Sequence, residues 1–230
     1  MRADRTEAGT RPTVRAFLLA LGVVSSLLYV GTDVAATLRW DGYSYADQFI
    51  SELMSIEAPT RPFVVSGFFL YGVLVTALGI GVVLSARAQR RLRIAGWLIV
   101  AYATVGYVGL LFFPMHLRGA VPPTTTWTDV MHILATSVIV LLTFAFVGFG
   151  ADAGGKGFRR YSIATIVLLL VCGVLISFEM PRLRAVQPTP WLGITERVTA
   201  YASMLWLLVL GVVLLRRVGA GARFLRWRSA

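Results

Sequence analysis

Cysteine, lysine and charge are all scarce in this sequence. Cys172 is the only cysteine, which excludes a disulfide within the chain, a cysteine-rich metal site and an iron–sulfur cluster. Lysine occurs once, at Lys156, against many arginines, a bias that hints at a GC-rich bacterial genome. Charged residues make up 14% of the chain and hydrophobic residues 57%. Soluble domains contain roughly 45–50% apolar residues, so this composition predicts an integral membrane protein.

Six apolar runs are each near the roughly 20 residues that a helix needs to cross about 30 Å of hydrocarbon. They cover residues 16–36, 63–84, 94–113, 130–150, 161–180 and 198–215. The sequence therefore predicts an all-α integral membrane fold with six transmembrane helices in one domain, residues 16–215, between basic tails at 1–15 and 216–230. The first run is longer than the apolar part of a signal peptide, so we expect a retained anchor.

The basic residues predict the orientation. Most of the 22 lie in the two tails and in the turns near residues 87–93 and 156–160. Cytoplasmic segments have such an excess, so we expect both termini in the cytoplasm and the chain in a bacterial cell (plasma) membrane. Nucleic-acid binding is not expected, because the basic residues are split among short segments without a reading module. Membrane lipids are the expected partners, and the oligomeric state is open.

Residues 43–61 are polar and periodic, and they lie between two apolar runs. Their apolar side chains fall on one side at helical spacing, and these are Phe49, Ile50, Leu53 and Ile56. The opposite side presents Asp47, Ser51 and Ser55, with Gln48 and Glu52 beside them. This pattern predicts a short amphipathic helix in the first outer loop, lying on the membrane surface.

Further ionisable residues are predicted at the same outer side. Asp33 lies in the outer third of the first run, where it is either a site residue or a carboxylate that pairs with Arg39. Glu196 and Arg197 precede the sixth run. They could pair with each other, cap the helix or face the other outer polar groups.

Two histidines complete the outer polar set. His116 and Arg118 follow the third run, and Asp129 and His132 lie three residues apart at the start of the fourth, hence on one helical face. Thr126 and Asp129 also fit a capping box, which gives Asp129 a structural alternative. His132 lies one turn deeper among apolar neighbours and is the stronger candidate for a functional residue.

The order of these motifs resembles bacterial and archaeal six-helix membrane proteins catalogued as domain of unknown function 998. The resemblance covers nearly the whole chain and rests on Tyr43-Ser44, Ile50-Ser51-Glu52-Leu53, Phe113-Pro114, His132 and Gly193-x-x-Glu196-Arg197. In many relatives the motif Phe-Pro-x-Asp ends in an aspartate, and this chain has His116 at that position. The resemblance supplies no activity, but it implies that Ser51, Glu52, His132, Glu196 and Arg197 are the positions of interest.

We favour a non-enzymatic role over an enzymatic one. In this hypothesis the chain is a lipid-binding or scaffold protein whose outer polar groups form a hydrogen-bonded lid over the bundle. Its binding residues are Asp47, Arg118, Glu196 and Arg197, and Glu52 helps to tie three outer loops together. Nothing in the sequence demands turnover. An ion-coupled transporter is disfavoured, because the middle of the membrane is left without charge.

The alternative is an outer-leaflet membrane hydrolase. In a metal-dependent version, His116, His132 and Asp129 hold a divalent metal such as zinc or manganese, whose bound water is the nucleophile. In a serine-dependent version, Ser51 is the nucleophile, His132 the base, and Glu52 or Asp129 the orienting acid. A haem between the two histidines is less favoured, because both lie at one surface. The cofactor is therefore unknown, with a divalent metal as one option.

Overall fold

The structure, a computed structural model, describes residues 3–120 and 126–228, with side chains described over 13–120 and 126–219. All regular elements in these ranges are helical, and they are α1 (Ala3–Thr37), η1 (Ile50–Met54), α2 (Arg61–Ser85), α3 (Arg90–Phe112), α4 (Trp127–Gly150), η2 (Ala151–Gly154), α5 (Gly155–Arg184) and α6 (Leu192–Arg228). Each predicted apolar run falls on one α-helix. The all-α prediction is therefore confirmed over the described ranges.

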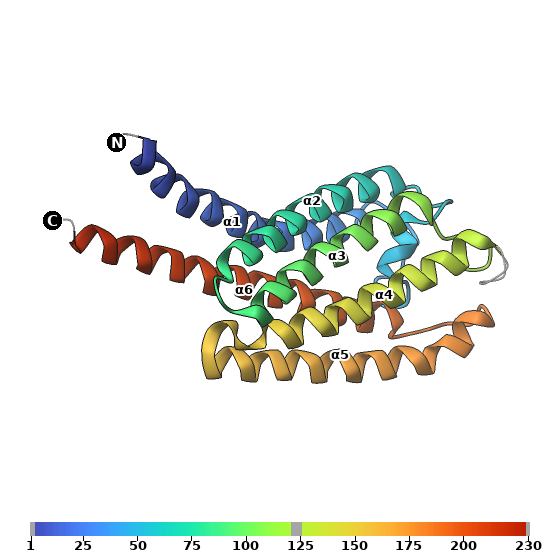
Figure 1. Ribbon diagram of the computed structural model, residues 1–230. Helices are drawn as coiled ribbons and strands as arrows, with labels where there is room; N and C mark the ends of the chain where they lie inside the picture. The colour runs from blue at the N-terminus through green and yellow to red at the C-terminus, as the bar shows by residue number, and fades with distance from the viewer. Residues whose placement is uncertain (1–2, 121–125, 229–230) are drawn as a thin grey trace.

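In the described part of the chain, five helical stretches are long and apolar enough to cross a membrane. They are Thr13–Thr37, Arg61–Ser85, Arg90–Phe112, Trp127–Arg184 and Leu192–Gly219. The fourth has 58 residues and contains α4, η2 and α5. The chain reverses at η2, so α4 and α5 run back along each other (Figure 1). Gly155 enters α5 with a φ of 77°, a left-handed conformation that glycine adopts at little cost.

The two chain termini lie at the same end of the bundle, where α1 and α6 extend beyond the other helices (Figure 1). The described residues of the predicted basic tails continue these two helices, because α1 begins at Ala3 and α6 ends at Arg228. The connections over residues 38–60, 113–120 and 185–191 lie at the opposite end (Figure 1). We call these three connections the lid.

An aromatic cluster fills the core between α4, α5 and α6. Trp206 is fully buried, and its ring centroid lies 5.5 Å from those of Phe146 and Phe158. Its indole N–H donates to the Ser162 hydroxyl at 2.9 Å, so the polar atom of this large side chain is satisfied. Trp206 therefore joins the α4–α5 hairpin to α6.

Glycines let α2 and α3 come into backbone contact. A Cβ atom on Gly79 would lie 2.9 Å from the Gly96 carbonyl oxygen, and one on Gly96 would lie 2.9 Å from that of Gly79. Small residues at a membrane helix crossing permit such close packing. These two helices thus pack closely against each other.

The predicted amphipathic helix over residues 43–61 is not a regular surface helix. Only the five-residue 3₁₀ helix η1 forms there, and Glu52 and Leu53 within it are buried, at 1% and 0% exposure. The backbone carbonyls from Tyr45 to Gln48 accept hydrogen bonds from α6 and other lid segments. They are unavailable for a helical ladder, so tertiary hydrogen bonds override the periodicity of the segment.

Candidate functional site

A buried ion pair joins the first and last helices beneath the lid. Arg197 on α6 donates from Nε to Asp33 Oδ2 at 2.9 Å and from Nη2 to Asp33 Oδ1 at 3.0 Å. Arg197 is 2% exposed and Asp33 fully buried. The two parallel bonds form the bidentate geometry that a guanidinium and a carboxylate favour. The predicted alternative of Asp33 pairing with Arg39 is wrong, since the Arg39 guanidinium donates to the Ala35 carbonyl.

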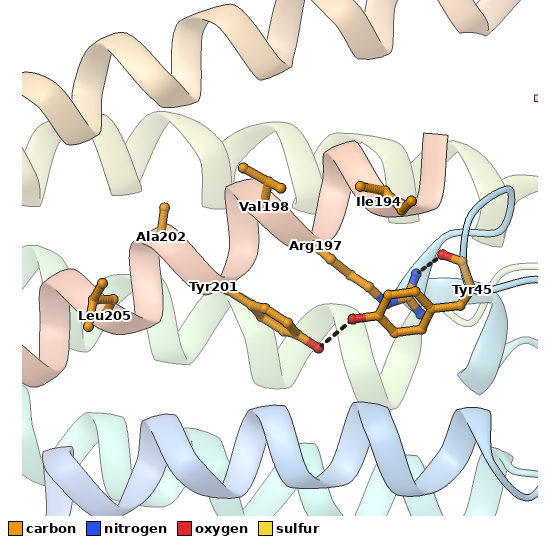
Figure 2. Close-up of a pocket in the computed structure, with 7 residues that line it drawn as sticks. All are labelled: Tyr45, Ile194, Arg197, Val198, Tyr201, Ala202 and Leu205. Carbon is orange, nitrogen blue, oxygen red and sulfur yellow. Dashed lines mark hydrogen bonds between the residues drawn. The ribbon is translucent and has the colours of Figure 1, made fainter. Parts of the chain in front are cut away.

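Arg197 also holds the first connection of the lid. Its Nη1 donates to the carbonyls of Tyr45 at 2.9 Å and Gln48 at 3.1 Å. The guanidinium carbon lies 3.9 Å from the centre of the Tyr45 ring, a cation–π contact that covers the charge with an aromatic face. Figure 2 shows the Tyr45 ring over the Arg197 guanidinium, with the Tyr201 side chain reaching towards it along α6.

Two tyrosines complete the surroundings of the ion pair. Tyr43 accepts a hydrogen bond from Arg197 Nη2 at 2.7 Å, and its own hydroxyl faces the Phe49 carbonyl at 2.8 Å. Burial raises the pKa of the Tyr43 hydroxyl well above its usual value, and the adjacent guanidinium offsets this only in part. The Tyr201 hydroxyl donates to Asp33. Asp33 therefore accepts from a guanidinium and a phenol while remaining buried.

The start of α6 makes a second contact with the lid through the Gly193 backbone and the Glu196 side chain. The Gly193 amide donates to the Ala46 carbonyl at 2.8 Å, and the Ile50 amide donates to Glu196 Oε2 at 2.5 Å. A Cβ atom on Gly193 would lie 2.4 Å from the Gln48 carbonyl oxygen. Only glycine permits this approach, which explains the need for Gly193 ahead of Glu196 and Arg197.

Arg118 joins all three connections of the lid. Its guanidinium forms two hydrogen bonds with the Glu52 carboxylate, with Nε to Oε2 at 2.7 Å and Nη2 to Oε1 as the second bond. Nη1 donates to the Thr189 hydroxyl at 2.9 Å and Nη2 to the Asp47 carbonyl at 3.0 Å. The Thr189 hydroxyl in turn donates to the same carbonyl at 2.9 Å. The three loops thus converge on Arg118.

The Glu52 carboxylate is further occupied by its own segment. It accepts from the Phe49 amide at 2.9 Å and from the Gln48 side-chain amide at 3.1 Å. Together with Arg118, these donors account for both oxygens of a nearly fully buried acid. A carboxylate held in this way serves to fix the backbone of η1.

His116 lies in the connection after α3 and His132 on α4, and the two histidines have separate partners. His116 Nδ1 lies 3.0 Å from Asp129 Oδ2, and the His116 amide donates to Asp129 Oδ1 at 2.8 Å. Asp129 also takes part in the predicted cap, since its amide donates to the Thr126 hydroxyl at 3.2 Å. His132 Nδ1 lies 3.0 Å from the Phe113 carbonyl. These contacts fasten the end of α3 to the start of α4.

The residues predicted to bind a metal are not gathered around one point. Among the residues that the structure describes, no group of three or more His, Cys, Asp and Glu side chains could hold a metal ion. His116 and Asp129 are paired, while His132 faces a backbone carbonyl. The three proposed ligands therefore do not fit a divalent metal in this arrangement.

The residues of the predicted serine site do not bind one another in the described ranges either. Within the described ranges, no hydrogen bond joins Ser51 to His132, and Glu52 binds Arg118. The orienting contacts of a nucleophile, base and acid are not formed in this arrangement. The predicted binding residues Asp47, Arg118, Glu196 and Arg197 do share one hydrogen-bonded cluster with Glu52.

Several members of this cluster were not singled out from the sequence as site residues. Tyr43 and Gly193 belong to the family motifs, while Thr189 and Tyr201 lie outside them. Tyrosine, threonine and glycine are frequent in membrane helices and loops, so their type gives little signal. The roles of Tyr201 and Thr189 depend on contacts with Asp33 and Asp47, and those of Tyr43 and Gly193 on contacts with Arg197 and Ala46; each partner is more than 140 residues away in the chain.

The fold and the polar cluster define a helical, multi-pass membrane protein with an ion-paired lid at one end. The chain belongs to a family of proteins of unknown function (DUF998), whose model matches residues 23–213. The matched region includes the Asp33–Arg197 pair and all three connections of the lid. No curated protein and no solved structure matches the chain.

Proposed function

We propose that this protein is a non-enzymatic, lipid-binding scaffold of the bacterial plasma membrane. It crosses the membrane six times, with both termini in the cytoplasm and the lid outside. The arginine excess at the end with the termini supports this orientation. The reversal of the chain at η2 supports two crossings in the 58-residue stretch Trp127–Arg184.

One observation supports the scaffold role above all. The buried charged groups of the lid and the helix ends beneath it bind one another and the lid backbone. Arg197 joins Asp33 to two lid carbonyls, and Arg118 joins Glu52 to the other two connections. Buried charges paired in this way favour one arrangement of the loops. The lid is then a rigid polar surface on which a partner or lipid headgroup can rest.

The test is the pattern of single substitutions. Glu52→Ala, Arg118→Ala and Arg197→Ala should each lower the yield of monodisperse protein in detergent, because each leaves a buried partner unsatisfied. Ser51→Ala and His132→Ala should lower it less. The same preparations, placed in vesicles of mixed bacterial lipids, are assayed for release of fatty acids or headgroups.

One result would contradict the scaffold role. Lipid turnover by the wild type that is lost in well-folded Ser51→Ala and His132→Ala proteins would overturn the scaffold role. It would favour the hydrolase with Ser51, His132 and Glu52 or Asp129 in the roles predicted from the sequence.

A further inference from the structure

The membrane-facing side of α6 bears a groove next to the lid. It has a volume of about 350 Å³, which is near the lower end of the roughly 300–1,000 Å³ typical of small-molecule pockets. Ile194, Val198, Ala202 and Leu205 line its length, and Tyr45 and Tyr201 lie at the side towards the lid (Figure 2). Val198 and Leu205 are 39% and 51% exposed, so the groove opens away from the bundle.

The dimensions of the groove match one leaflet of a bilayer. From Ile194 to Leu205 the helix rises about 16 Å, at about 1.5 Å per residue. Half of a hydrocarbon core about 30 Å thick is about 15 Å. The groove begins at the lid end of α6 and runs towards the middle of the span Leu192–Gly219. It therefore follows the path of a single acyl chain in the leaflet next to the lid.

The charge in the groove wall is not available to a ligand. Arg197 has five N–H donors, and these face Asp33, the Tyr43 hydroxyl and the carbonyls of Tyr45, Gln48 and Gly193. Asp33 balances its charge, and the Tyr45 ring covers its face at 3.9 Å. Among the described residues that line the groove, the surface consequently offered is hydrocarbon and aromatic, with no free cation.

One donor remains at the lid end. The Tyr201 hydroxyl gives its proton to Asp33, so in its contact with the Tyr45 hydroxyl it can only accept. That contact is long, at 3.4 Å, and Tyr45 is 37% exposed. The Tyr45 hydroxyl therefore donates to Tyr201 in a long contact, and its proton can be redirected to an oxygen near the top of the groove, where the ester carbonyl of a bound lipid would lie.

We propose that this groove binds one acyl chain of a phospholipid in the leaflet next to the lid, with the Tyr45 hydroxyl on the ester carbonyl, and that binding is indifferent to headgroup charge. The inference rests on the lipid-binding part of the proposed function, and it names the surface that binds and the part of the lipid that is bound. It uses only the position of the groove relative to the lid, and it holds whichever leaflet the lid faces.

The test is photo-cross-linking of the full chain in symmetric vesicles. The probe is a phosphatidylcholine with a diazirine midway along one acyl chain, and the sites of attachment are mapped by mass spectrometry. We expect attachment at residues 194–205 to exceed that on the exposed face of α5 by about tenfold. This ratio corresponds to a chain whose binding in the groove is about 1.4 kcal/mol more favourable than its place in bulk lipid. Even labelling of both faces would overturn the proposal.

A matched pair of variants checks the location. Ala202→Phe fills the groove and should reduce its labelling to the level on α5. Ala164→Phe, at an exposed position of α5, adds the same ring elsewhere and should change nothing. Labelling of the groove that survives in a folded Ala202→Phe protein would contradict the proposal. If that variant does not fold, the wild-type labelling map decides alone.

A second probe checks the indifference to charge. The same diazirine chain on phosphatidylglycerol should label the groove within about threefold of phosphatidylcholine, a difference under about 0.7 kcal/mol. A larger preference for the anionic lipid would overturn the assignment of an uncharged site. Because no result here depends on catalysis or on the lid's stability, failure of this inference is distinguishable from failure of the scaffold role.

Discussion

Arg197 on the last helix makes a bidentate ion pair with Asp33 on the first, and the same guanidinium holds two carbonyls of the lid. The contact ties three parts of the chain to one buried charge. A buried pair is costly to break from one side, because the remaining charge has no water to solvate it.

Substitution of either partner should therefore destabilise the protein strongly. Asp33→Ala and Arg197→Ala should each lower the free energy of unfolding by about 3–5 kcal/mol. Denaturation in detergent, followed by circular dichroism, measures the change. The exposed Arg39 serves as control, and Arg39→Ala should cost about 0–1 kcal/mol. The double variant Asp33→Ala/Arg197→Ala should be less destabilised than the sum of the two single changes, and simple additivity would count against the pair.

Gly193→Ala should separate the lid from α6. The new methyl group would lie 2.4 Å from one backbone oxygen and 2.6 Å from another, and neither atom belongs to a flexible side chain. Overpacking of this kind costs about 1–3 kcal/mol. Gly173→Ala is the matched control, because nothing lies within 4 Å of its Cβ position, and this change should stabilise the helix by up to about 1 kcal/mol. Equal effects of the two changes would show that the contact at Gly193 is unimportant.

Arg118→Lys should loosen the lid while keeping its charge. Lysine cannot reproduce the two bonds to Glu52 together with those to Thr189 and Asp47. Backbone amides of residues 47–54 should then exchange hydrogen faster, by about tenfold for each 1.4 kcal/mol of lost local stability. Hydrogen exchange with mass spectrometry measures this. Arg182→Lys, at an exposed position of α5, should leave the exchange of this segment unchanged.

Thiol labelling should distinguish the two ends of the bundle. In a Cys172→Ser background, Gln187→Cys in the lid should react with a membrane-impermeant maleimide on intact cells. Lys156→Cys at the opposite end should react only after the membrane is opened. Both original side chains are exposed, so whether each cysteine reacts depends on whether the maleimide reaches its side of the membrane. The reverse pattern would invert the proposed orientation, and labelling of both on intact cells would contradict the proposed topology.

The helices were predictable from the sequence, and the lid was predictable only in part. A run of apolar residues is sufficient to mark a helix in a membrane, so all six predicted runs fall on α-helices. The cap at Thr126 and Asp129 was also predictable, because capping depends on residues close together in the chain. The irregular course of residues 43–61 was not, because their carbonyls bond to side chains and amides from distant segments.

The pairing of acids with bases in the site was likewise predictable only in part. That Glu52, Arg118, Glu196 and Arg197 would tie the loops together followed from their common placement at one end of the helices. Which acid meets which base did not follow, and the neighbouring Arg39 was a plausible but wrong partner for Asp33. A pairing over 164 residues depends on which helices are adjacent, and hydropathy contains no information about that order.

The pairing of Asp33 with Arg197 also sets an order on biogenesis. At about 5–20 residues per second of synthesis, the arginine emerges from the ribosome about 10–30 s after the aspartate. Through that interval the first helix has a carboxylate without its partner, and the lid backbone lacks the donors on α6. The nascent chain thus lacks these contacts until its last helix has been synthesised. Any product truncated before α6 would expose the unpaired carboxylate and the unpaired lid carbonyls to membrane quality control.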